Sequence, residues 1–283
     1  MMRAWMAMAL AALVALAGCM TTGPAVGTKA PAGDAATQRE SAARASERDT
    51  AATPSASPAS SQGPAAGEPA RLVDAGPRSG DAIALTFHLG AIVDPAPAIM
   101  AWLRDNEVPA TIFVSGAAVE RTDSDAGRAA VEIVDARPDL FELGSHGFAA
   151  EDFTALTPEE VGEELRRAEV ALARLVAQDP RPLFAPPAGA WSDAVLAAAG
   201  SAGYAWAVRW DVDPVDWKPM AAGGPSSAEI VDRVLGAAQS GSIVLLQLGG
   251  PETLEALPDL VAGLRERFRL VRVSELLGLG GVD

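Results

Sequence analysis

The chain has 283 residues, 49% of them apolar, which is enough to bury the core of one or two domains. Residues 81–283 carry 15 basic and 31 acidic side chains, and such an acidic surface repels a phosphate backbone. Nucleic acid is therefore not expected as a partner, and the single cysteine, Cys19, excludes a disulfide within one chain.

The first residues have the pattern of an export signal. Arg3 is followed by an apolar run that is too short to span a membrane. The run ends in Leu16-Ala17-Gly18-Cys19, which resembles the lipobox of bacterial lipoproteins and implies cleavage before Cys19 and acylation of its thiol. We expect residues 1–18 to be a signal peptide and the mature protein to be held at the membrane by this lipid, in the outer membrane if the host has two membranes. The alternative is an ordinary signal peptide with a chance cysteine.

Residues 19–80 predict a disordered tether. They consist mostly of Ala, Pro, Ser, Thr and Gly, and bulky apolar side chains are almost absent. Such a segment cannot bury enough surface to offset the entropy of ordering its backbone. The globular domain is therefore expected to span residues 81–283.

From residue 81 onward, strand and helix patterns alternate. Thr157, Pro158 and Glu160 form an N-cap, a first-turn proline and a capping-box glutamate, which predict a helix start. Alternating strands and helices predict an α/β fold with a mainly parallel sheet, open or closed into a barrel. The expected strands are 82–87, 110–114, 142–146, 204–208, 243–248 and 271–273, and the expected helices include 96–106, 192–201, 226–239 and 254–267.

The residues that follow these strands include the groups best suited to chemistry. In parallel α/β folds, sites form at the carboxyl ends of the strands. His88 and His146, the two histidines of the chain, both stand at such ends. The densest carboxylate cluster, Asp211 to Asp216, follows another strand.

The order of these segments resembles the NodB-homology domain of polysaccharide deacetylases, carbohydrate esterase family four. The resemblance covers about residues 81–277 and is carried by the stretches 83–87, 108–114, 142–146 and 210–217. It implies a distorted (β/α) barrel. It also implies removal of acetyl groups from glycans such as chitin or peptidoglycan with the help of one divalent metal.

The same resemblance implies that the metal site is degenerate. After its first strand the family has Thr-Phe-Asp-Asp-Gly, which supplies the general base and a metal ligand, and here those two positions are His88 and Leu89. The family's two metal histidines correspond to His146 and Ala150. Only one of three ligands remains, whereas a catalytic zinc normally has three protein ligands, so no cofactor is expected.

The remaining catalytic positions are also changed. The arginine that orients the base in the family corresponds to Ala185, and the histidine that acts as general acid corresponds to Gln247, two residues after Leu245. The motif that lines the substrate groove is intact as Asp213, Asp216 and Trp217. The chemistry is therefore expected to be lost and the groove to be kept, with Leu245 as a further groove residue.

Three functions remain open on the sequence. The first is an inactive deacetylase-like domain that binds an envelope glycan, either peptidoglycan or a chitin-like polymer. The second is an active glycan deacetylase with a rebuilt site, in which His88 is a general base or joins His146 in a zinc or other divalent-metal site helped by Asp94, Asp152 or Asp213. The third is a structural or protein-interaction module of the envelope, in which Trp217 is core filler.

Overall fold

The computed structural model describes residues 67–149 and 151–279 of the chain. The expected signal peptide, Cys19 and most of the expected tether lie outside the described residues, and so does Ala150. None of the helices in the two described ranges combines the length and the hydropathy that a membrane span requires.

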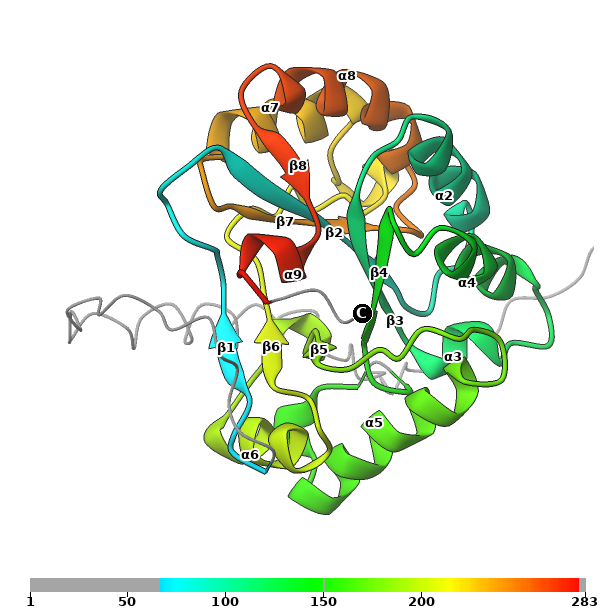
Figure 1. Cartoon of the computed structure of the whole chain (residues 1–283). Helices are drawn as coiled ribbons and strands as arrows, with labels where there is room; N and C mark the ends of the chain where they lie inside the picture. The colour runs from blue at the N-terminus through cyan, green and yellow to red at the C-terminus, as the bar shows by residue number, and fades with distance from the viewer. Residues whose placement is uncertain (1–66, 150, 280–283) are drawn as a thin grey trace, which may run out of the picture. The chain divides into compact units, whose positions relative to one another are not determined.

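Within these ranges eight strands form one sheet, and all neighbouring strands are parallel (Figure 1). Their order is β1-β6-β5-β4-β3-β2-β7, and β8 pairs with the first residues of β2 while β7 pairs with its last residues. The strands are β1 (Arg71–Val73), β2 (Ala82–Leu89), β3 (Ala110–Val114), β4 (Phe141–Ser145), β5 (Leu183–Phe184), β6 (Trp206–Val208), β7 (Ile243–Gln247) and β8 (Arg269–Val271).

The chain after β6 closes this sheet into a ring. Val212 forms a parallel bridge with Val244 of β7, and the Leu245 amide donates to the Val212 carbonyl at 2.9 Å. Strands β2 to β7 thus enclose an interior, with an irregular seam between β6 and β7. The predicted distorted (β/α) barrel is confirmed.

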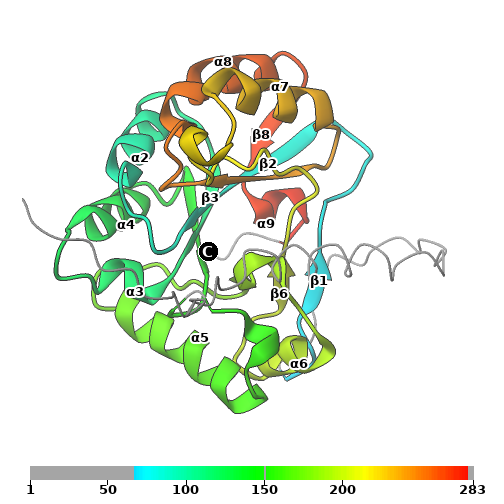
Figure 2. The ribbon, with the colours of Figure 1, turned by 180° about the vertical axis from the view of Figure 1, so that it is seen from behind.

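Helices α2 to α8 lie outside the strands, whereas α9 lies within the ring and packs Val273 and Leu276 into the interior cluster (Figures 1 and 2). Neighbours pack against each other around the barrel: α2 contacts α4 and α8, α5 contacts α3 and α6, and α7 contacts α8. The helices are α2 (Ala96–Asp105), α3 (Gly116–Val119), α4 (Ala126–Ala136), α5 (Pro158–Leu172), α6 (Asp193–Ser201), α7 (Ser227–Ala237), α8 (Thr253–Arg265) and α9 (Val273–Leu276), with short 3-10 turns η1 (Phe153–Ala155), η2 (Pro187–Gly189) and η3 (Met220–Ala222).

The expected capping box at the start of α5 is present. The Glu160 amide donates to the Thr157 hydroxyl, and the Thr157 amide donates to the Glu160 carboxylate. Two expected boundaries are wrong. Regular structure is already present before residue 81, because Arg71–Val73 pairs with β6 as an edge strand too short to be recognised from its sequence. The last strand ends at Val271 rather than Val273, which instead begins α9.

Strand β2 has one face toward the helices and one toward the barrel interior, since side chains alternate along a strand. Ala84 belongs to the interior cluster that also holds Phe113 and Ala185. The other face of β2 packs in the outer core against the helices, and it consists of Ile83, Leu85, Phe87 and Leu89. His88 is therefore on the interior face and Leu89 on the outer face.

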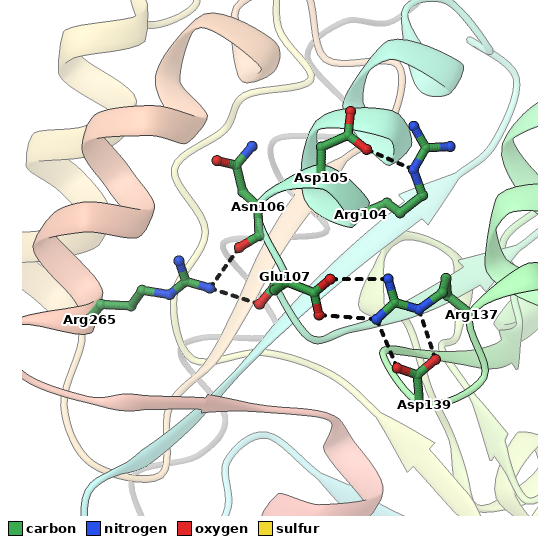
Figure 3. A network of polar contacts seen from close by, with 7 residues as sticks. All are labelled: Arg104, Asp105, Asn106, Glu107, Arg137, Asp139 and Arg265. Atoms are coloured by element: carbon green, nitrogen blue, oxygen red, sulfur yellow. Dashed lines mark hydrogen bonds and ion pairs between the residues drawn. The ribbon is translucent and has the colours of Figure 1, made fainter.

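Paired charges cover the amino-terminal end of the barrel (Figure 3). Glu107, at φ 50°, follows α2, and both oxygens of its carboxylate accept from Arg137 at 3.2 and 3.0 Å. Arg137 also pairs with Asp139, and Arg265 of α8 donates to the Glu107 carbonyl at 2.8 Å. These contacts join the ends of α2, α4 and α8. Each of these charged side chains has a hydrogen-bond partner within the network.

Candidate functional site

The two histidines meet at the carboxyl-terminal mouth of the barrel. His88 is the last residue but one of β2 and His146 follows β4, and their rings contact edge to face with centroids 4.6 Å apart. The His146 Nδ1 lies 2.8 Å from the Ala185 carbonyl oxygen. Because a carbonyl accepts, this nitrogen carries the proton, and Nε2 of the neutral ring is left as an acceptor.

Burial keeps both rings neutral. Only 3% of His88 and 7% of His146 is exposed. Burial lowers the pKa of His146 to about 4, against a weaker opposing effect of its bond to Ala185. Burial, and secondarily the neighbouring His146, lowers the pKa of His88 well below its ordinary value.

Aromatic groups fill the space around His88. Its ring makes edge-to-face contacts with Phe113, at a centroid distance of 5.3 Å, and with Trp210, at 5.7 Å. Trp210 in turn lies against the loop after β5, where a Cβ on Gly189 would stand 3.0 Å from the indole. Ala185, at the position expected for the orienting arginine, is fully buried in this cluster. Side chains that pack against one another around His88 therefore fill the interior of the mouth.

One of the expected metal-ligand positions, Leu89, does not face the mouth. Leu89 is fully buried in the outer core, on the face of β2 opposite His88. Ala150 lies outside the described residues. Gln247, at the position expected for the general acid, is the register partner of His88 on β7, so the structure does bring these two together.

The loop that follows β6 holds a strained conformation. Val215 has φ 66°, a left-handed value that is rare for a β-branched residue. The Val215 amide donates to the Asp213 carboxylate at 2.7 Å, and Arg233 of α7 donates to the Pro214 carbonyl at 2.8 Å. Strain of this kind persists only where surrounding contacts impose it, and it is concentrated at functional sites.

Asp216 anchors this loop rather than facing a ligand. Its side chain is fully buried, and one carboxylate oxygen accepts from the Gln247 amide at 2.8 Å and from the Thr253 hydroxyl at 2.6 Å. Its other oxygen has no hydrogen-bond partner among the described residues, and burial raises its pKa to about 7. Leu245 is only 3% exposed. The expectation that Asp216 and Leu245 line the groove is wrong, because both side chains are packed inside the protein.

Trp217, at the end of the same loop, is 51% exposed, so it is not core filler. It belongs to a rim of exposed apolar side chains on loops that follow β2, β5 and β6. Sequence reasoning missed Trp191, which comes directly after the Pro-Pro-Ala-Gly-Ala segment that follows β5. The rim consists of Ile92, Trp191, Trp217 and Met220, and Val170 on α5 is the one other large apolar side chain so exposed in the described part of the chain.

Comparisons with known proteins agree with this architecture. Residues 75–207 match the family model for polysaccharide deacetylase. The chain is 30% identical to a chitooligosaccharide deacetylase of Sinorhizobium fredii, over 69% of this chain and 93% of the relative. It is also 30% identical to a peptidoglycan-N-acetylglucosamine deacetylase of Bacillus cereus, over 71% of this chain and 90% of the relative.

Among solved structures, the chain resembles a family pseudoenzyme from Bacillus anthracis. The two are 25% identical, with a TM-score of 0.63 over 75% of this chain and 71% of the other. The matches define a carbohydrate-esterase type of α/β barrel. The chain belongs to the polysaccharide deacetylase family.

The described residues do not fit the divalent metal that family membership implies. In residues 67–149 and 151–279 no three His, Cys, Asp or Glu side chains gather closely enough to hold a metal ion. His88 and His146 supply two nitrogens at most, and their immediate neighbours are Phe113 and Trp210 rather than carboxylates. A catalytic zinc needs three protein ligands and an open position for water.

Proposed function

We propose that this protein is an exported, lipid-anchored member of the family that binds an envelope glycan and does not deacetylate it. The observation that carries the proposal is the contrast at the barrel mouth. Its interior is packed with neutral and apolar groups, while the loop 213–217 keeps a strained conformation that leaves Trp217 half exposed. An exposed indole presents a flat apolar face, which suits the apolar face of a sugar ring.

The absence of hydrolysis follows from the groups at the mouth. A metal-assisted deacetylation needs an ion that polarises the acetyl carbonyl and activates a water. It also needs an acid to protonate the leaving amine, and Gln247 has no proton that it can transfer. His146 holds its Nδ1 proton against the Ala185 carbonyl, and neither imidazole is accessible enough to serve as a base for a bulky substrate. The neighbouring pseudoenzyme supports this proposal.

The relatives indicate which polymers to test. One curated relative acts on chitooligosaccharides and another on peptidoglycan, and both polymers carry N-acetylated sugars. Asp213 is an exposed residue of the same loop as Trp217. One of its carboxylate oxygens accepts from the Val215 amide, and the other is available to accept hydrogen bonds from sugar hydroxyls. Shallow sites of this kind bind at about micromolar to millimolar Kd.

The test is a calorimetric titration of residues 67–283 with chitotetraose and with peptidoglycan fragments. Wild type should bind at least one of them. Trp217→Ala should abolish binding without loss of folding, since the indole is half exposed, and Trp217→Phe should retain part of it. If wild type binds neither glycan, the glycan-binding proposal fails and a protein-interaction role takes its place.

Lipid anchoring is tested separately. Cys19→Ala should leave the precursor uncleaved by the lipoprotein peptidase and should move the protein out of the membrane fraction. Mass spectrometry of the mature protein should find acyl chains on Cys19. A mature N-terminus elsewhere, without acyl mass, contradicts the anchor.

A further inference from the structure

Two tryptophans are exposed at the mouth of the barrel. Trp191 is 42% exposed and Trp217 is 51% exposed. Indoles are usually well buried, and exposed apolar groups that cluster on one face mark interaction sites. Val170, the comparably exposed apolar side chain away from the mouth, stands without such neighbours on α5.

The two tryptophans lie on loops that are attached to different strands of the barrel. Trp191 follows β5 and the turn η2, whereas the loop of Trp217 is fastened to β7 through the bond between Asp216 and the Gln247 amide. Strand β6 lies between them in the ring. Neighbouring strands are about 4.8 Å apart, so the two attachment points are separated by about 10 Å. Two tryptophans on loops attached to different strands can contact different sugar rings of one chain.

Trp210 closes the interior of the mouth beside the turn that leads to Trp191. Its indole contacts His88 and lies against Gly189 of that turn. Two successive left-handed residues, Ala188 at φ 55° and Gly189 at φ 66°, shape that turn. A ligand at this mouth therefore lies across this packed interior and cannot insert a substituent deep into the barrel.

Building on the proposed glycan binding, we propose that Trp191 is a second sugar-stacking platform and that the site takes a linear oligosaccharide of several units laid across the mouth. Trp217 binds one part of the chain and Trp191 a part further along. Met220 and Ile92, which are 52% and 57% exposed, add apolar side chains on the loops that follow β6 and β2. The site thus recognises polymer length, and a single sugar occupies only one platform.

The test is to measure the affinity of the same protein for chitooligosaccharides from the disaccharide to the hexasaccharide. Wild type should bind the longer chains roughly tenfold more tightly than the disaccharide, because a second stacked ring is added. Trp191→Ala should remove this gain, so that the longer chains bind no more tightly than the disaccharide. Trp191→Phe should retain part of the gain, whereas Trp191→Leu should not, since a leucine keeps apolar area but has no flat ring.

Val170→Ala is the matched control, an exposed apolar truncation away from the mouth, and it should leave affinity at every length unchanged. The inference is overturned if Trp217-dependent binding is found but affinity is independent of length, or if Trp191→Ala leaves the length dependence intact. In either case glycan binding itself still stands. If no chitooligosaccharide and no peptidoglycan fragment binds, the proposed function and this inference fail together.

Discussion

The interior of the barrel mouth and the loop 213–217 sit at the same end of the molecule, yet they differ in how their residues are used. In the interior, the positions expected for the base and its orienting arginine are His88 and Ala185, which are buried and packed. In the loop, Val215 keeps an unfavourable backbone conformation that Asp213, Asp216 and Arg233 maintain. The proposed function therefore assigns chemistry and binding to separate sets of residues, of which the first is replaced and the second is kept.

The largest expected effect is at the outer face of β2. Leu89→Asp should destabilise the protein by more than the roughly 2–5 kcal/mol that truncating a buried leucine costs, because it places an unpaired carboxylate in the apolar core. Urea denaturation measures the change. Leu89→Met, which nearly conserves volume, should cost less than about 1.5 kcal/mol. If Leu89→Asp is as stable as wild type and gains a zinc ion, the orientation of this position is wrong.

The next effect concerns the anchor of the loop. The folded-state pKa of Asp216 is raised from 3.8 to about 7, so folding favours its protonated form. The free energy by which the protonated Asp216 carboxyl stabilises the fold is therefore fully present below about pH 4. It is lost as the pH rises to about 7, and the loss is at most about 4 kcal/mol. Asp216→Asn, which stays neutral, should lack this loss, so its stability relative to wild type should rise over that interval. Parallel stability curves for the two proteins contradict the prediction.

The histidines should show the opposite dependence. The folded-state pKa of His146 is lowered from 6.5 to about 4, so folding favours the neutral ring. The free energy by which the neutral His146 ring stabilises the fold is fully present above about pH 6.5. About 3 kcal/mol of it is lost as the pH falls to about 4. Proton NMR can follow the two imidazoles of the chain, with His88→Gln and His146→Gln to assign them. Titration of both rings near pH 6.5 would show that the mouth is open to water.

The smallest effect is expected at the opposite end of the barrel. Glu107→Ala removes a carboxylate that Arg137 contacts, but the Glu107 side chain is 69% exposed, and ion pairs with an exposed partner add little stability (Figure 3). The denaturation midpoint should stay close to that of wild type, and glycan affinity should not change. A loss of glycan binding in this variant would mean that the site is not confined to the carboxyl-terminal end.

Local patterns predicted most of the fold. Alternating apolar strands, the capping box at Thr157 and the resemblance in the strand-end motifs were sufficient for the barrel. The three-residue strand β1 was missed because it is ordered by pairing with β6, which no local pattern records. Some site residues were missed for a similar reason. Motif order places Asp216 in the groove, but its burial under β7 and α8 depends on contacts distant in sequence.

Trp191 also shows that local sequence does not determine whether a side chain is buried or exposed. A tryptophan two residues before the start of α6 is as compatible with core packing as with a surface role, and only the fold shows which one holds. The outward orientation of Leu89 likewise follows from the register of β2 against β3 and β7. Motif comparison identifies what a position has lost, and the fold determines whether a side chain there reaches the site.

The central claim is that this mouth binds an acetylated glycan without hydrolysing it. One proton NMR titration tests both parts, because adding the protein to chitotetraose broadens the sugar signals if the glycan binds and produces a free acetate signal if it is hydrolysed. The account predicts saturable broadening that Trp217→Ala abolishes, with no acetate above the level of a His88→Gln, His146→Gln double variant. Acetate release that depends on either histidine, or sugar signals unchanged by wild type, would contradict it.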